Sequence, residues 1–234
     1  MLSSTEVLEM TLPCVQRDFT EWRQGRIFYA VWALDLDTPE LRARSESLRA
    51  RFAEYFLPDY CRQPHVTVDL CGFPASKAML DDDYSFSAFF EQVACLSAAQ
   101  PAPFVIEIGQ PDSFASAAYF TLADTDGGIE RLRGVLGTTG PANVFSYVPH
   151  VTFGLHRRAV PLGRLVQELQ AADGAENLSF EISKLSLMIY QASVIGGPLS
   201  TLAEFDLRRR HLEVREPSRM DELFGESWRK SVFP

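Results

Sequence analysis

Histidine and cysteine are both scarce in this chain, with four of each among 234 residues. The cysteines, Cys14, Cys61, Cys71 and Cys95, have neither the paired spacing of a metal site nor the pattern of a disulfide framework, so we interpret them as reduced thiols. Basic residues are also in deficit, because 22 Lys and Arg stand against 31 Asp and Glu and give a formal net charge of -9. This deficit argues against a protein that coats long nucleic acid through a basic surface.

Long apolar runs are missing as well. No stretch approaches the roughly 18 apolar residues that span a bilayer, and residues 1–14 lack a basic region followed by an apolar run. We therefore expect no membrane association and no secretory signal, and together with reduced thiols this predicts a cytoplasmic protein. No linker rich in Gly, Ser or Pro divides the chain, so we expect a single domain over residues 1–234, present as a monomer.

Two of the four histidines occur in the same tetrapeptide, Pro-His-Val-Thr, at residues 64–67 and again at residues 149–152. Each copy opens an apolar, β-branched run, over residues 65–70 and 150–155, and such runs are typical of strands. A repeat of this kind, built on so rare a residue, is a signal rather than a coincidence. We take it as the feature around which the chain is organised.

A strand alternates its side chains between two faces, so His65 shares a face with Thr67, and His150 shares one with Thr152. An imidazole can give or take a proton between pH 5 and 8, and a Thr hydroxyl can hold an anionic oxygen. Two copies facing each other would supply a base, an acid and two hydrogen-bond donors, a sufficient set for displacement at phosphorus without a metal. The alternative is a pair of structural histidines and ordinary strand threonines; the duplicated context favours catalysis.

The two His-x-Thr motifs resemble those of the two-histidine (2H) phosphoesterase superfamily, which includes RNA 2′,3′-cyclic phosphodiesterases once named 2′-5′ RNA ligases. Their histidines, at positions 65 and 150, are also separated as in that family. The resemblance covers about residues 26–207. It implies an α+β fold of two pseudo-symmetric lobes, each an antiparallel sheet flanked by helices, around a central cleft to which each lobe contributes one motif. Residues 1–25 then form a leader, and residues 208–234 form a tail outside the family-like core.

Hydrophobic periodicity independently predicts an α+β chain, because strands alternate with helices and several strands are joined by hairpin-length turns. The expected strands cover residues 26–34, 65–73, 104–108, 118–122, 150–155, 178–190 and 200–207. The expected helices cover residues 38–55, 86–96, 129–136 and 161–169. Within residues 178–190 the alternation slips near Ser183, which we interpret as a bulge.

Two further residues are candidates for substrate binding. Trp32 lies in a segment that resembles the first strand of plant-type cyclic phosphodiesterases, where a Trp lines the pocket; the alternative is a core aromatic. Many relatives carry Arg or Tyr five residues after the second motif histidine, where it contacts the phosphate, but here that position is Leu155. Basic residues 156–158 follow at once, and we take Arg157 as the candidate for the missing charge, against a solvated basic cluster.

These features predict a phosphodiesterase of 2′,3′-cyclic phosphates on nucleotides or RNA ends, acting through two histidines with no metal and no cofactor. The acidic run 81–83 has no ligand spacing and is expected to be a solvated turn. The resemblance implies that the 3′-oxygen leaves and a 2′-phosphate remains. Cleavage of 2′-5′ oligonucleotides or cyclic nucleotide signals stays open, as does a non-catalytic binder of phosphorylated RNA ends. The sequence also leaves open which histidine is the acid and which is the base.

Overall fold

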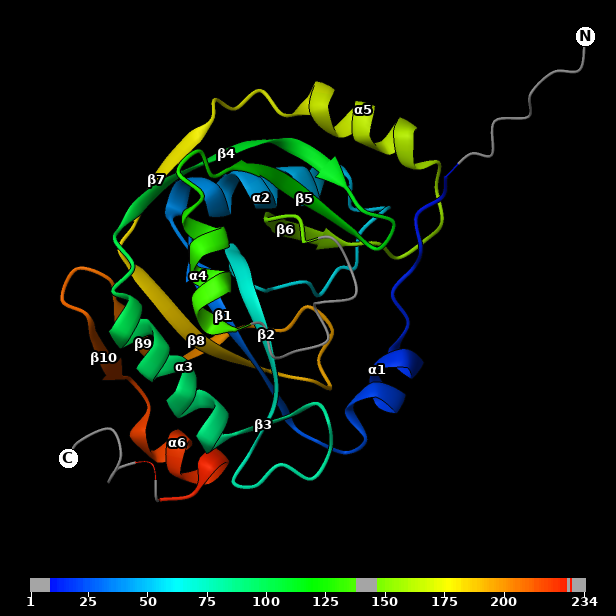
Figure 1. Cartoon of the computed structure of the whole chain (residues 1–234). Coiled ribbons are helices and arrows are strands. Elements are labelled where there is room, and N and C mark those ends of the chain that lie inside the picture. Colours follow the sequence, from blue (N-terminus) through cyan, green and yellow to red (C-terminus); the bar gives the residue numbers. More distant parts are fainter. Residues whose placement is uncertain (1–8, 138–146, 227, 229–234) are drawn as a thin grey trace, which may run out of the picture.

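The computed structural model describes residues 9–137, 147–226 and 228, whose strands form two sheets (Figure 1). The first sheet has the strand order β10-β9-β8-β1-β2-β3. Its strands are β1 (Phe28–Asp35), β2 (His65–Ala75), β3 (Asp83–Ser85), β8 (Lys184–Gln191), β9 (Ser200–Asp206) and β10 (His211–Val214). Neighbouring strands in it run antiparallel except for the parallel pair β2 and β3.

The second sheet has the order β6-β5-β4-β7 and is antiparallel throughout. Its strands are β4 (Phe104–Ser113), β5 (Ala117–Ala123), β6 (His150–Leu155) and β7 (Leu178–Ile182). One His-x-Thr motif therefore opens β2 in the first sheet, and the other opens β6 in the second. Each motif strand pairs with the strand that precedes it across a helix, which gives the two lobes their pseudo-symmetry and confirms the predicted α+β class.

The helices are α1 (Gln16–Arg23), α2 (Pro39–Arg51), α3 (Phe86–Ala99), α4 (Gly128–Leu136), α5 (Leu162–Ala172) and α6 (Pro217–Phe224). Local sequence explains where two of them begin. Thr38 caps α2 by accepting a hydrogen bond from the backbone N–H of Leu41, and Ser85 caps α3 in the same way from Ala88. No helix in the part of the chain that the structure describes is long and apolar enough to cross a membrane.

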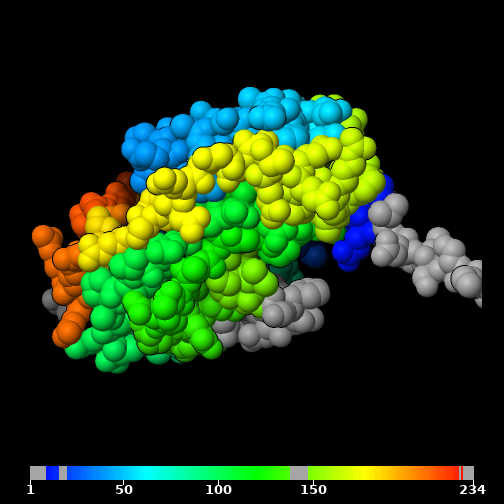
Figure 2. All heavy atoms as spheres, turned by 90° about the horizontal axis from the view of Figure 1, so that it is seen from above, coloured from blue at the N-terminus to red at the C-terminus, as the bar shows by residue number. Residues whose placement is uncertain are grey.

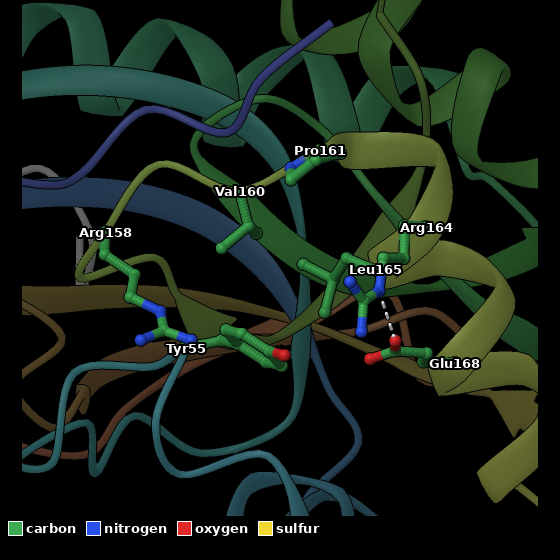
Figure 3. A pocket seen from close by; sticks show the side chains of 7 residues that line it. All are labelled: Tyr55, Arg158, Val160, Pro161, Arg164, Leu165 and Glu168. Atoms are coloured by element: carbon green, nitrogen blue, oxygen red, sulfur yellow. Dashed lines mark hydrogen bonds and ion pairs between the residues drawn. The ribbon is translucent and has the colours of Figure 1, made fainter. Parts of the chain in front are cut away.

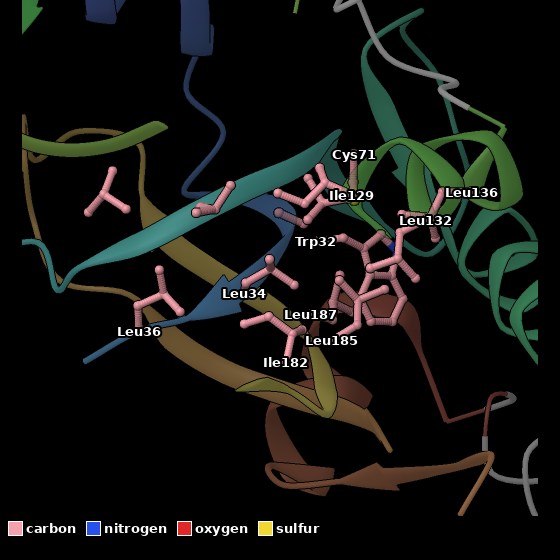
Figure 4. Close-up of a cluster of buried hydrophobic side chains, with 14 of the residues drawn as sticks. Trp32, Leu34, Leu36, Cys71, Ile129, Leu132, Leu136, Ile182, Leu185 and Leu187 are labelled. Carbon is pink, nitrogen blue, oxygen red and sulfur yellow. The ribbon is translucent and has the colours of Figure 1, made fainter. Parts of the chain in front are cut away.

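Both sheets contribute to one large hydrophobic core. Trp32 and Leu34 of β1 belong to this core, as do Ile129, Leu132 and Leu136 of α4, and in Figure 4 Trp32 lies beside α4. Helix α5 packs on β4 in the second lobe. In Figure 2 the yellow chain of α5 and β7 runs along the surface between the blue-to-cyan chain around α2 and the green chain around α4.

The predicted long strand over residues 178–190 is wrong. It is two strands, β7 and β8, which belong to different sheets and are separated by Ser183. The slip in alternation is therefore a crossover between the lobes and not a bulge within one strand. At this point the carbonyl of Ser183 accepts a hydrogen bond from the backbone N–H of Leu207 at 2.9 Å, so the crossover is tied to the end of β9.

The segment expected as a tail continues the first lobe. Strand β10 extends its sheet, and α6 buries Phe224 against Phe89 of α3 with ring centroids 5.9 Å apart. Trp228 is buried as well, and its indole N–H donates to Asp221 at 2.8 Å. Residues 1–8 of the expected leader, and residues 227 and 229–234 of the tail, lie outside the described part of the chain.

Candidate active site

His65 stands at the start of β2, and its imidazole has a fixed orientation. Its Nδ1 lies 2.8 Å from the carbonyl oxygen of Gln63. Because a carbonyl can only accept, Nδ1 carries the hydrogen, and Nε2 of the neutral ring is left with a free lone pair. Gln63 is itself held, since its side chain accepts from the Leu199 N–H and donates to the Leu199 carbonyl, both at 2.8 Å. The β8–β9 connection thus fixes the histidine through Gln63.

His150 repeats this arrangement at the start of β6. Its Nδ1 lies 2.7 Å from the carbonyl oxygen of Val148, again two residues earlier, so its Nε2 also has the free lone pair. The ring is half-exposed and stands nearly perpendicular to Phe114, with centroids 4.9 Å apart, and at 64° to Tyr119, 5.3 Å away. In both imidazoles Nε2 is therefore the nitrogen with the free lone pair, but the residues around the two rings differ.

Strand pairing places each threonine on the face of its histidine. On β2, His65 is opposite Asp35 and Thr67 is opposite Ala33; on β6, His150 and Thr152 hold the corresponding positions against β5. The two motif strands contact each other, and His150 is near enough for its charge to lower the pKa of His65. The structure thus brings together the four residues predicted from the repeat.

A β-bulge follows each motif at the same place. Pairing with β1 passes from Thr67 to Asp69 and skips Val68, and pairing with β5 passes from Thr152 to Gly154 and skips Phe153. Such an extra residue reverses the alternation that follows it. Leu155, an odd five residues after His150, therefore lies on the face of the histidine rather than on the opposite one.

Burial lowers the pKa of both histidines. His65 is 7% exposed, and desolvation lowers its pKa to about 4, assisted by the charges of Arg62 and His150 and opposed by the hydrogen bond to Gln63. Burial also lowers the pKa of His150. In both cases the neutral imidazole is favoured in the free protein.

Arg62 is a cation near the motif that sequence reasoning missed. Its guanidinium lies over the ring of Tyr190, 4.1 Å from the centroid, and its Nε donates to the carbonyl of Gly197 at 3.0 Å. Its charge reaches His65, as the lowered pKa of that residue records. The only signal in the sequence was its position three residues before His65, which carries no chemistry by itself.

Trp32 does not line the site. It pairs with Asp69 on β2, is 0% exposed, and donates from its indole N–H to the side-chain oxygen of Gln92 at 2.8 Å. Its ring stacks against Phe89 of α3, with centroids 6.2 Å apart. The expectation of a pocket residue is therefore corrected: Trp32 is on the core face of β1, one residue out of phase with Ala33, which faces the motif.

Both arginines that follow β6 are exposed. The backbone N–H of Arg157 donates to the carbonyl of Tyr55 at 2.9 Å. Arg158 enters a separate pocket (Figure 3) and pairs with Glu54 at 2.7 Å. The second arginine of that pocket, Arg164, pairs with Glu168, so both cations there are already neutralised.

The acidic run 81–83 has a structural role. Arg26 donates to the carboxylates of Asp82, at 2.9 Å from its Nη2, and of Asp83, at 3.1 Å from its Nη1. Among residues 9–137, 147–226 and 228, no group of His, Cys, Asp and Glu side chains is arranged to hold a metal ion.

Two sheets that each bring one His-x-Thr strand to a shared face have the architecture of the two-histidine phosphoesterases. Residues 37–193 match the family model of the 2′-5′ RNA ligase superfamily, and the chain belongs to this superfamily of 2H phosphoesterases.

Solved structures that are similar to this chain have low sequence identity to it. The protein TT0787 of Thermus thermophilus is 17% identical with a TM-score of 0.51, over 77% of this chain and 98% of that one. LigT of E. coli in its apo form is 16% identical with a TM-score of 0.47, over 78% and 98%. Usb1 of Kluyveromyces marxianus, solved with uridine monophosphate, has a TM-score of 0.39 at 15% identity, over 76% and 97%. No curated protein sequence matches the chain.

Proposed function

We propose that this protein is a phosphodiesterase that opens 2′,3′-cyclic phosphates on nucleotides or RNA ends by acid/base catalysis between two histidines. The observation that supports this best is the repeated imidazole geometry. Each Nδ1 is fixed on the carbonyl two residues earlier, and each Nε2 is available on one of two strands in contact. A base and an acid acting at one phosphorus need such a pair of oriented nitrogens.

We assign the base to His65 and the acid to His150. His65 is the more deeply buried ring and is close to Arg62, so it stays neutral to the lowest pH and can accept a proton. His150 is half-exposed, and its pKa is lowered by burial with no charged residue contributing, so it keeps its proton more readily.

The reaction balances with these two groups. Nε2 of His65 takes a proton from water as the water oxygen bonds to phosphorus, and the bond from phosphorus to the ribose 3′-oxygen breaks. His150 gives its proton to that departing oxygen, so a 2′-phosphate remains. Thr67 and Thr152 donate from their hydroxyls to the non-bridging oxygens as negative charge develops.

Phosphate anchoring is assigned to Arg62 instead of Arg157. Leu155 stands at the position where relatives carry a polar contact, and an aliphatic side chain cannot hold an anion. Arg62 is held by its bond to Gly197 and by the ring of Tyr190 beneath it, and its charge is near enough to His65 to lower the pKa of that imidazole. An arginine can hold two phosphate oxygens at once from its planar guanidinium group.

The decisive experiment is turnover of a 2′,3′-cyclic mononucleotide, followed by phosphorus NMR with and without a chelator. We expect hydrolysis to the 2′-phosphate alone, at the same rate in both conditions. A mixture of 2′- and 3′-phosphates would contradict two groups acting from fixed, opposite sides. Loss of activity on chelation, restored by one divalent ion, would contradict the metal-free mechanism. Turnover of 2′-5′ dinucleotides in place of the cyclic substrate would change the substrate class.

A further inference from the structure

The backbone of each motif is held by a tyrosine from the other lobe. The hydroxyl of Tyr147, which lies three residues before His150, donates to the carbonyl of Thr67 at 2.8 Å. The hydroxyl of Tyr60, which lies five residues before His65, donates to the carbonyl of Thr152 at 3.2 Å. Each tyrosine thus leads into one motif and bonds to the equivalent atom of the other.

An arginine repeats the exchange one residue further along each strand. Arg133 of α4 donates from Nη1 to the carbonyl of Val68, and Arg49 of α2 donates from Nη1 to the carbonyl of Phe153 at 3.1 Å. Helix α2, which precedes β2, packs on β6, whereas α4, which precedes β6, packs on β2. The crossed pattern therefore includes the helices as well as the loops.

Each arginine also lies over the tyrosine that serves the same strand. The guanidinium of Arg133 is 3.7 Å from the ring centroid of Tyr147, and that of Arg49 is 5.5 Å from the ring centroid of Tyr60. A cation over an aromatic face is attracted to it, so the two members of a pair hold each other in place. We call Tyr147 with Arg133, and Tyr60 with Arg49, the crossed pairs.

The bulges explain why these bonds are needed. Val68 and Phe153 are the residues that strand pairing skips, and a bulge disrupts the ladder hydrogen bonds around it. Buried backbone carbonyls require partners. Here the partners come from the opposite lobe, so they also fix where one motif strand lies relative to the other.

We propose that the crossed pairs are positioning residues, through which each lobe sets the geometry of the opposite lobe's histidine and threonine. None of the four side chains touches the reacting atoms in this proposal. Their effect on turnover rests on the proposed phosphodiesterase function, but their effect on histidine geometry does not.

The test that needs no substrate uses NMR of the histidine ring signals. With four histidines in the chain, His65→Gln and His150→Gln assign the two signals of interest. Tyr147→Phe removes the hydroxyl bonded to Thr67, so we expect the larger shift at His65; Tyr60→Phe should act mainly on His150. Tyr55→Phe is the matched control, because its ring lies under Arg158 in the separate pocket of Figure 3. The crossed assignment would be overturned if Tyr147→Phe shifted His150 more than His65 and Tyr60→Phe shifted His65 more than His150. It would also be overturned if the shifts were no greater than those of Tyr55→Phe.

Kinetics on the cyclic substrate then separates positioning from mere stability. We expect Tyr147→Phe and Tyr60→Phe each to lower kcat about tenfold with KM within about twofold, as loss of transition-state geometry does. Arg133→Lys should retain more kcat than Arg133→Gln, because only lysine keeps a cation over the ring of Tyr147. Crossed NMR shifts together with unchanged kcat would overturn the positioning role.

If wild type turns over no cyclic substrate, the proposed function fails, while the NMR arm still decides the crossed contacts. Thermal unfolding of every variant shows whether a loss of kcat follows from loss of fold. If a variant unfolds, Arg49→Lys or Arg133→Lys is tested in its place, because lysine keeps the positive charge of the crossed pair.

Discussion

The motif strands β2 and β6 are built from the same parts and placed in different surroundings. Both orient a histidine on the carbonyl two residues earlier, both bulge after the threonine, and both receive a tyrosine and an arginine from the other lobe. Around β2, however, the histidine is 7% exposed and near Arg62, whereas around β6 it is half-exposed beside Phe114 and Tyr119.

The fourth position after each histidine also differs. On β2 it is Asp69, which is buried and accepts from Gln92 at 3.1 Å. On β6 it is Gly154, where a Cβ would lie 2.9 Å from the ring of Phe56. The duplicated hydrogen bonds thus fix the two imidazoles in the same way, whereas the residues around them are not duplicated. The proposed acid and base roles rest on that difference in surroundings.

The largest loss of activity should come from removing either imidazole. We expect His65→Gln and His150→Gln each to lower kcat by about two to four powers of ten, because each loses one proton-transfer partner. Circular dichroism should show both variants folded. Near-full activity in either folded variant would exclude the two-histidine mechanism.

Removing either threonine hydroxyl should lower activity by a smaller factor. Thr67→Val and Thr152→Val keep the β-branched shape of the strand and remove one donor to the developing charge, so we expect kcat to fall by about ten- to a hundredfold in each. Single-turnover rates would measure the effect on chemistry directly. Valine variants that match wild type would show that the hydroxyls are only strand formers.

The lowered pKa values of both histidines predict an acid-side optimum. In the proposed mechanism His65, with a pKa of about 4, must be neutral, and His150, whose pKa is lowered by burial, must be protonated. The value of kcat/KM should therefore rise as His65 loses its proton and fall about tenfold per pH unit once His150 has lost its own. The free energy of unfolding should also depend on pH. Because both histidines have a lower pKa in the folded protein, the unfolded chain binds more protons below about pH 6.5, so the free energy of unfolding should decrease as pH falls. A kcat/KM that rises through pH 8 would reject the assignment.

Substitution of Arg62 and of Arg157 tests whether the cation near β2 differs in function from the one after β6. Arg62→Gln should raise KM about three- to tenfold through loss of a phosphate contact, and it should also raise the pKa of His65 by removing a nearby charge. Arg157→Gln is the control and should leave both quantities unchanged. Equal effects of the two substitutions would show that Arg62 does not anchor the substrate.

The smallest effect on activity is expected at Trp32. Trp32→Phe removes the bond to Gln92 and part of the core volume, so it should lower the free energy of unfolding by about 1–3 kcal/mol while KM stays at the wild-type value. Denaturant unfolding beside steady-state kinetics measures both. A raised KM in a stable variant would return Trp32 to the substrate pocket.

Local sequence was sufficient where local physics determines the structure. The capping residue Thr38 located the start of α2, and the repeated tetrapeptide located β2 and β6. Alternation alone could not tell which face of β1 would be core, so Trp32 was placed on the wrong side. It also could not distinguish a bulge from a crossover at Ser183, because both appear as a slip in phase.

The remaining site features depend on contacts between distant residues. Tyr60 and the carbonyl it holds are 92 positions apart, and Tyr147 and its carbonyl are 80 apart. Nothing in the sequence around either tyrosine indicates such a partner, because the acceptor is backbone and has no side-chain signature. Arg62 is similar, since its orientation is set by Gly197 in the β8–β9 connection.

The crossover at Ser183 has a consequence for the order in which the molecule can assemble on the ribosome. The second sheet uses one continuous stretch, from β4 to β7, and its strands have all been synthesised before β8 begins. The first sheet needs β8 as the neighbour of β1, so strands made at the outset wait for strands made near the end. Domains and their parts fold as their chains become available. The hydrogen bonds between Gln63 and Leu199, which fix His65 through Gln63, therefore form only after the lobe that carries His150 can already be complete.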